Sequence, residues 1–272
     1  MLDERADEPG GGPGAGTGGR GGGGGRGAAR AAGRSAAGMA ATPVVLVLAV
    51  AALFAYLHGR HLDAIERRSV NRDVIVQRFV EHIELVAVST ALVLAIAIPL
   101  GVLLTRPGMR PLSAPFLALA NIGQAVPSIG VLVLLAVTVG IGFQKAVIAL
   151  ILVSALPVLR NTMVGLQGVD RALIDAGRGI GLSRTAVLLR VELPLAVPVI
   201  LASVRVAVIL NVGSATLAAF TNAGGLGDLI NTGIALNRTP ILLTGSVLTA
   251  VLAMAADWLI GIVEHYLRPR GI

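Results

Sequence analysis

Long apolar runs separated by short polar segments make up the chain from residue 39 onward. Each run has roughly the 20 apolar residues that a helix needs to cross the hydrocarbon core of a bilayer. None of the runs alternates apolar and polar residues with the period of two that is typical of outer-membrane β-barrels. The pattern predicts about six transmembrane helices, near residues 39–57, 81–104, 112–139, 146–166, 194–220 and 240–263.

The two ends of the pattern predict how the chain is divided. Residues 1–38 begin with acidic and polar residues and continue as a Gly and Ala tract with scattered arginines. Such a segment cannot bury enough apolar surface to offset its ordering entropy, so we expect a disordered cytoplasmic tail. Residues 39–79 are expected to form an uncleaved signal-anchor span and an external loop. Residues 80–270 are expected to form one membrane domain.

Composition supports a bilayer as the solvent of this chain. Hydrophobic residues make up 55% of the sequence and charged residues 14%, and the mean hydropathy is +0.83. These values predict an all-α integral membrane protein. The formal charge of +7 is the charge of a membrane protein with basic loops, and we expect no nucleic-acid partner. With no cysteine, disulfides, thiolate chemistry and cysteine-based metal sites are excluded.

Arginines near the ends of the predicted spans indicate the orientation. With six spans, these arginines fall on one side, which the positive-inside rule makes cytoplasmic. Both termini of this multi-pass inner- or plasma-membrane protein are then predicted to be cytoplasmic. The loop that carries Arg60, Arg67, Arg68, Arg72 and Arg78 must lie outside, which runs against the rule. The arginines that favour the orientation are Arg20, Arg26, Arg30, Arg34, Arg106, Arg110, Arg171, Arg178, Arg184, Arg190, Arg268 and Arg270.

The predicted cytoplasmic segment from Val169 to Pro194 has more internal pattern than a simple connector needs. Asp170 can cap a first short helix, and Gly181 can end it in a left-handed conformation. Ser183 can cap a second helix that runs to Pro194, where the next span begins. An amphipathic helix pair of this kind, held at the membrane surface, is typical of a docking surface for a partner.

This segment resembles the EAA loop of permeases of binding-protein-dependent ABC importers, which has a Glu-Ala-Ala triplet, a Gly and a terminal Ile-x-Leu-Pro. The matching positions are Asp175, Ala176, Gly177, Gly181, Val191, Leu193 and Pro194. Asp keeps the negative charge of Glu, and Gly replaces the second Ala. The resemblance implies a type I ABC importer permease core in which this loop is the coupling helix, seated in a groove of the ATPase subunit. It assigns that role to Asp175, Ala176, Gly177 and Gly181.

Three further stretches resemble the osmoprotectant branch of these permeases, which imports glycine betaine, choline, carnitine and related quaternary ammonium solutes. They are Gln124 to Ser128, Pro157 to Asn161 and Ala215 to Gly227. The resemblance covers about residues 80–270. Asn222 stands where the branch more often has Gly, and methionine-importer permeases carry a stretch similar to Ala223–Gly227. Methionine or another amino acid is therefore the alternative cargo.

Residues inside the predicted spans suggest a translocation path. Pro127 interrupts the third span, and breaks of this kind often line such a path, so we expect Gln124 and Ser128 to face it, unless the break is a packing kink. Gly224 and Gly225 can form a gate or a re-entrant turn. Asn211, Ser214, Thr216 and Thr221 can supply hydrogen bonds to the path or join helices. Arg205 and Asp257 can pair with each other or snorkel to the membrane surface.

Catalytic and cofactor motifs are absent from the sequence. It has no GxxxxGK[ST] phosphate loop, so we expect no catalytic residue and no cofactor in this chain, with ATP used by a partner subunit. His58, His61, His82 and His265 lack metal-ligand spacing and are predicted to have surface or interfacial roles. Glu81 and Glu84 lie at the entrance of a predicted span without a partner and are expected to be interfacial. No metal site is expected.

The resemblance implies three protein partners beside membrane lipid: an ABC ATPase, a second permease subunit that is a copy or a paralogue, and an extracytoplasmic solute-binding protein. Since few aromatic residues are present, a quaternary ammonium ligand would be selected by that binding protein. An ion-coupled secondary transporter or channel is an alternative from another class, which Arg205 and Asp257 favour but which leaves the coupling-loop pattern unexplained. A non-transporting membrane scaffold is a third alternative.

Overall fold

The computed structural model describes the backbone of residues 24–125 and 127–267, and side chains from residue 41 onward except those of residues 120, 123–126, 265 and 267. The chain divides into two compact units, Met1–Ala40 and Ala41–Ile272, and the fold described below is that of the second. All regular secondary structure in the described residues is helical, which confirms the predicted all-α class.

Eleven α-helices and three short helices of other types follow one another in the described residues. The α-helices are α1 (Gly24–His58), α2 (Ala64–Ser69), α3 (Arg72–Thr105), α4 (Ser113–Ala125), α5 (Ser128–Thr138), α6 (Phe143–Gln167), α7 (Arg171–Gly179), α8 (Arg184–Val187), α9 (Leu193–Ala215), α10 (Leu226–Ala235) and α11 (Thr239–Leu267). The others are the 3₁₀-helices η1 (Arg110–Leu112) and η3 (Thr216–Thr221) and the π-helix η2 (Leu188–Glu192).

Five helical stretches in the described residues are long and apolar enough to cross a membrane: Ala41–His58, Arg72–Thr105, Phe143–Gln167, Arg184–Thr221 and Thr239–Glu264. The predicted span at 112–139 is not one helix, because α4 ends at Ala125 and α5 starts at Ser128. Pro127 lies between them and has no backbone N–H to continue the hydrogen-bond ladder. The break that the sequence predicts at Pro127 is present.

Two helices begin earlier than the hydrophobic pattern predicts. The side chain of Asn71 accepts a hydrogen bond from the Val74 N–H and caps α3, so this helix includes polar residues from Arg72 onward that were assigned to the external loop. Helix α1 begins at Gly24 and extends into the segment expected to be a disordered tail. Alanine is frequent there and is the strongest helix former. Residues 1–23 lie outside the described part of the chain.

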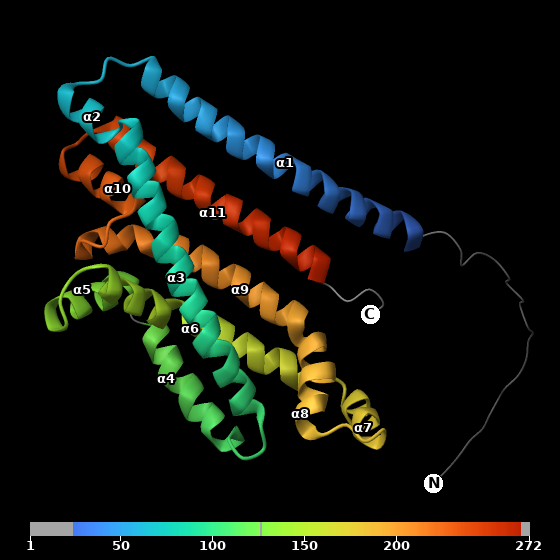
Figure 1. The fold of residues 1–272 in the computed structure, drawn as a ribbon. Coiled ribbons are helices and arrows are strands. Elements are labelled where there is room, and N and C mark those ends of the chain that lie inside the picture. Colours follow the sequence, from blue (N-terminus) through green and yellow to red (C-terminus); the bar gives the residue numbers. More distant parts are fainter. Residues whose placement is uncertain (1–23, 126, 268–272) are drawn as a thin grey trace, which may run out of the picture. The chain divides into compact units, whose positions relative to one another are not determined.

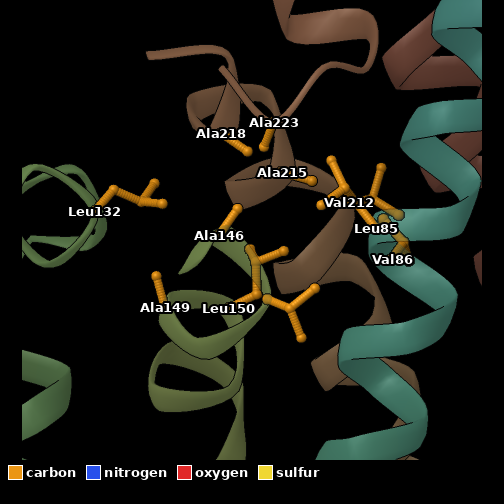
Figure 2. Close-up of a cluster of buried hydrophobic side chains, with 11 residues drawn as sticks. Leu85, Val86, Leu132, Ala146, Ala149, Leu150, Val212, Ala215, Ala218 and Ala223 are labelled. Carbon is orange, nitrogen blue, oxygen red and sulfur yellow. The ribbon is translucent and has the colours of Figure 1, made fainter. Parts of the chain in front are cut away.

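Helices α3, α6 and α9 pack on one another at the centre of this unit, α11 packs against α9, and α10 packs against α11, η3 and α3 (Figure 1). Figure 2 shows the largest buried cluster, in which Leu132 of α5 points towards alanines of α6, α9 and η3. Alanine side chains let helix backbones approach closely, which is how helices associate in a bilayer. The members are Leu85, Val86, Leu132, Ala146, Val147, Ala149, Leu150, Val212, Ala215, Ala218 and Ala223.

Two glycines make the packing of α10 possible. A Cβ at Gly227 would collide with the carbonyl of Thr216, and a Cβ at Gly233 would collide with the backbone of Leu242 in α11. Each glycine lies on a helix whose neighbouring backbone leaves no room for a side chain. These close approaches fix the position of the segment after η3, which includes the predicted gate glycines.

The order of the long helices places the connecting segments at two opposite ends of the bundle (Figure 1). The turn after α3 and the pair α7–α8 lie at one end. Helices α2 and α10 lie at the other end. The two predicted functional regions, the coupling segment and the glycine turn, are therefore on opposite sides of the membrane domain.

Candidate functional site

Helices α7 and α8 begin at the two caps that the sequence predicts between Val169 and Pro194, but the second helix does not stop at Pro194: α8 continues through η2 into α9. The carboxylate of Asp170 accepts a hydrogen bond of 2.9 Å from the Ala172 N–H and caps α7. The hydroxyl of Ser183 accepts one of 3.2 Å from the Ala186 N–H and caps α8. Between them Gly181 has a φ of +88°, and the Leu182 N–H donates to the Gly177 carbonyl. The chain therefore turns sharply between two capped helices.

The four residues predicted to couple with a partner occupy different places on this pair. Asp175 and Ala176 are exposed, whereas Gly177 is buried against the side chains of α8 and η2. Gly181 forms the turn and is exposed. Gly177 thus allows α7 to pack onto α8, while Asp175 and Ala176 are available for contact. Exposed apolar side chains nearby are Leu173 of α7, Ile180 at its C-cap and Leu189 of η2.

An ion pair that the sequence reading missed attaches this pair to the membrane helices. Arg106, the C-cap residue of α3, donates from both terminal nitrogens to Glu192, at 2.6 Å and 3.2 Å. Only 8% of the Glu192 side chain is exposed. Arg106 also donates to the Thr105 hydroxyl. A forked guanidinium–carboxylate contact fixes geometry as well as charge. It therefore joins the end of η2, directly before α9, to the end of α3.

Both residues of this ion pair stand out in the sequence, but a local interpretation of each of them does not pair them. Arg106 was counted among the arginines that set orientation, and Glu192 lies in the segment that was compared with the coupling loop. An acid immediately before the apolar run that starts at Leu193 must find a partner once it is buried. The separation of 86 residues hides that partner from any local pattern.

The predicted path residues are spread over several elements: Gln124 lies in α4, Ser128 starts α5, and Asn211 and Thr216 lie in α9 and η3, with η3 packed against both α5 and α9. Pro127 is exposed and Ser128 is partly buried at the start of α5, and the side chain of Gln124 lies outside the described residues. Asn211 is fully buried, and its amide donates to the Thr90 hydroxyl of α3 at 3.0 Å. The Thr216 hydroxyl donates to the carbonyl of Gly213. Asn211 thus joins α9 to α3, and Thr216, the first residue of η3, bonds to the end of α9.

Gly224 and Gly225 form a left-handed turn that residues of α3 hold in place. Their φ angles are +80° and +92°. The Gly225 N–H donates to the carboxylate of Glu81 at 2.9 Å, and the Leu226 N–H donates to Nδ1 of His82 at 3.3 Å. Because Nδ1 accepts, Nε2 of His82 carries the proton and donates to the carbonyl of Val212 at 3.1 Å. The turn is thereby tied to both α3 and α9.

The prediction of a surface or interfacial role for His82 was wrong, and Glu81, expected to be interfacial without a partner, has three hydrogen-bond donors. His82 is fully buried, and the carboxylate of Glu81 accepts hydrogen bonds from the protein on three sides. Their partners on the glycine turn are more than 140 residues away, so neither helix periodicity nor metal-ligand spacing could reveal them. A polar residue at the start of an apolar run was the one local signal.

Arg78 joins the same network through two carboxylates. Its Nη1 lies 2.8 Å from Glu81 and 2.8 Å from Asp228 in α10. Burial raises the pKa of Asp228 above its ordinary value, and the charge of Glu81 adds to this, while the Arg78 guanidinium opposes both. The three charges therefore bind α10 to α3 on the side of the bundle opposite α7 and α8.

Arg205 and Asp257 pair with each other, which decides between the two possibilities that the sequence left open. The guanidinium of Arg205 donates to both carboxylate oxygens of Asp257, with one contact of 2.6 Å, and lies 3.9 Å from Glu264. The contacts join α9 to α11. Pairing offsets the cost of charges at bilayer depth. Among the described residues, no group of three or more His, Cys, Asp or Glu side chains could hold a metal ion.

The fold combines long apolar helices around an alanine-rich core, a span broken into α4 and α5, and the exposed capped helices α7 and α8 at one end. This combination is that of a multi-pass transport permease. The chain belongs to the family described as binding-protein-dependent transport system inner membrane components, whose family model matches residues 97–269. Members of this family are transport permease subunits of the inner membrane, the class that the EAA-like segment indicated.

Curated relatives agree with the resemblance to the osmoprotectant branch. The choline transport system permease protein OpuBB of Bacillus subtilis is 38% identical over 192 residues, which are 71% of this chain and 88% of the relative. The osmoprotectant import permease protein OsmY of Salmonella typhimurium is 38% identical over 228 residues, 84% of this chain and 94% of the relative. The carnitine transport permease protein OpuCD of Listeria monocytogenes is 38% identical over 206 residues, with coverages of 75% and 92%.

Solved structures show the same fold. An inward-facing structure of the MetNI methionine ABC transporter matches with a TM-score of 0.61 and 26% identity, and covers 71% of this chain and 95% of that chain. A crystal structure of an amino acid ABC transporter with histidines matches with a TM-score of 0.62 and 15% identity, with coverages of 76% and 100%. The second match supports the fold alone. The predicted type I permease fold is confirmed.

Proposed function

We propose that this chain is the transmembrane permease subunit of an ATP-driven importer of osmoprotectants such as glycine betaine, choline or related quaternary ammonium solutes. The observation that carries the proposal is the set of relatives named for choline, osmoprotectant and carnitine transport, each 38% identical over more than two thirds of this chain. The domain from about residue 80 to 270 forms the permease, and residues 39–79 add a signal-anchor span.

The exposed side of α7 and α8 is the proposed docking surface for an ABC ATPase. Asp175 and Ala176 would contact the ATPase, and Gly177 and Gly181 would shape the pair. Since Arg106 and Glu192 join this pair to α3 and α9, closure of two ATPase subunits on ATP would displace those helices together. An ATPase acts on the cytoplasmic side, so docking at this surface places α7, α8 and both termini in the cytoplasm. ATP would be bound and hydrolysed by the partner subunit.

The opposite side of the domain is proposed to receive a solute-binding protein. Gly224 and Gly225 would act as a gate that α3 holds closed through Glu81 and His82. Gln124, Pro127, Ser128, Asn211 and Thr216 are the proposed lining of the path, which a second permease subunit would complete. With an aromatic fraction of 3%, this chain has few rings for cation–π contacts to an ammonium group, so the binding protein would select the solute.

A methionine or other amino acid importer is the second candidate. The structural match at 26% identity to a methionine ABC transporter favours it, and fold and coupling would be unchanged. An ion-coupled secondary transporter would need free ionisable groups in the spans, whereas Arg205 and Asp257 pair with each other.

Uptake into vesicles that contain this subunit and its co-purifying partners tests the proposal. Labelled glycine betaine, choline and methionine are offered with and without ATP. We expect ATP-dependent accumulation of a quaternary ammonium solute. Accumulation of methionine alone would favour the second candidate, an amino acid importer. Uptake that is independent of ATP would overturn the proposed coupling to an ATPase.

A further inference from the structure

A groove of about 540 Å³ lies between the end of α1 and the start of α3, on the side of the domain opposite α7 and α8. Six of its lining residues are apolar: Phe54, Leu57, Leu62, Val70, Ile75 and Val76. The other two are His58 and Arg72. Its volume falls within the range of about 300 to 1,000 Å³ that is typical of small-ligand sites. An apolar ligand with an anionic group would match this lining.

The groove lies where spans meet the membrane surface. Helix α1 ends at His58 and α3 begins at Arg72, with α2 between them (Figure 1). Leu57 and Ile75 are buried in a cluster with residues of α10 and α11, which holds the two helix ends on the domain. Phe54 and Val76 remain exposed. The apolar wall therefore faces the hydrocarbon region, and the polar rim faces the head groups.

The rim carries positive charge that the protein does not neutralise. In the part of the chain that the structure describes, Arg72 has no ion pair and no hydrogen bond to an acid. Arg67 and Arg68 are likewise without an ion pair there, and Arg60 stacks over the ring of Tyr56. In the orientation proposed above, these arginines lie on the external side of the membrane, where the positive-inside rule disfavours them.

Most nearby acids are already engaged. Asp63 pairs with Arg238, and the Glu66 carboxylate accepts the Asp63 N–H in a capping box. Glu81 and Asp228 share Arg78. The Glu66 carboxylate keeps its charge when it accepts a backbone N–H, and Asp73 lies in the first turn of α3, so two negative charges face four arginines. An anion from outside the chain would complete the charge balance.

We propose that this groove binds an anionic phospholipid, with an acyl chain along Phe54, Leu57 and Val76 and the phosphate on Arg72. The guanidinium group matches a phosphate with two parallel hydrogen bonds, which an ammonium group cannot do. Arg68 lies just before the start of α3, so its charge adds to the positive potential at the rim. The site explains why an arginine-rich segment stands on this side of the membrane, and it is independent of the transported solute.

Native mass spectrometry of the delipidated full-length chain in detergent tests this site with two lipids of equal acyl chains. The lipids are dioleoyl phosphatidylglycerol and dioleoyl phosphatidylcholine. We expect the wild type to retain the anionic lipid preferentially. Arg72→Gln should lower that preference about fivefold, which corresponds to one basic side chain at a membrane surface. Val76→Trp, which fills the groove, should lower retention of both lipids.

Arg67→Gln is the matched control, because it removes the same charge from the same segment without touching the groove. Because Arg67 adds charge near the rim but does not line the groove, this variant should lower the preference for the anionic lipid less than Arg72→Gln does. Equal losses in Arg67→Gln and Arg72→Gln would overturn the site in favour of general charge attraction. Equal retention of the two lipids by the wild type would overturn it as well. Unchanged retention of phosphatidylcholine by Arg72→Gln shows that this variant is folded.

Discussion

Single residues of this protein act through partners that are far away in sequence. Arg106 and Glu192 join α3 to η2, His82 joins α3 to both α9 and the glycine turn, and Asn211 joins α9 to α3. In a bilayer a polar side chain without a partner costs several kcal/mol, and each of these residues makes at least one hydrogen bond, although the amide oxygen of Asn211 has no partner in the described residues. These pairs therefore connect the helices more specifically than the alanine-rich core does.

Loss of the Arg106–Glu192 pair should weaken coupling and stability together. Arg106→Ala leaves the buried Glu192 carboxylate without a cation, which costs on the order of 3 kcal/mol. We expect a lower Tm for the purified subunit and slower ATP-driven uptake per molecule inserted. Arg110→Ala removes a nearby exposed arginine without a buried partner and serves as control. Equal melting temperatures for the two variants would contradict this role for Arg106.

A reversed charge at Asp175 should affect coupling without affecting the fold. Asp175 is exposed on α7, so Asp175→Arg should insert and melt like the wild type. Because we place it against the ATPase, ATP-driven uptake should fall by at least about tenfold, equivalent to roughly 1.4 kcal/mol. Uptake and insertion are measured on the same vesicles. Wild-type uptake by this variant would remove Asp175 from the docking surface.

At the scale of the element, the sequence predicted local features well and long-range ones poorly. The caps at Asp170 and Ser183, the turn at Gly181 and the break at Pro127 depend on neighbouring residues, and all four are present. The start of α3 was placed too late, because hydropathy does not register a polar helical turn. The buried position of His82 depends on a contact with Leu226 that no periodicity encodes.

The turn between α7 and α8 should tolerate only glycine at its centre. Gly181 has a φ of +88°, where a side chain costs about 1 to 2 kcal/mol, so Gly181→Leu should change the angle between the two helices. We expect impaired ATP-driven uptake with normal insertion. Gly108→Leu is the control, since that glycine has open space around it and no positive φ. Equal uptake by the two variants would show that this angle is unimportant.

At the scale of the whole molecule, apolar run lengths were enough to predict the class and most spans. They could not predict that the third span consists of two helices, α4 and α5, although Pro127 marked the break. The family match covers residues 97–269 and leaves the first span outside. That span contacts the rest of its unit mainly through Leu53 and Leu57 near one end.

Removal of residues 1–38 should therefore leave transport largely intact. The Gly and Ala tract lies outside the family match and precedes the first span. We expect uptake per inserted molecule to stay within about twofold of the full chain, since twofold corresponds to less than about 0.5 kcal/mol. Abolished uptake with normal insertion would show that the tail takes part in transport.

Site-directed cross-linking tests the central claim most directly, because the natural chain has no cysteine. A single Ala176→Cys, labelled with a thiol-reactive photo-cross-linker, is placed in the exposed part of α7, and Ile234→Cys is placed in the exposed part of α10 at the opposite end. We predict that Ala176→Cys forms a covalent adduct with a co-purifying ATPase and that Ile234→Cys does not. An intact complex in which Ala176→Cys forms no adduct with the ATPase, while Ile234→Cys does, would contradict the account.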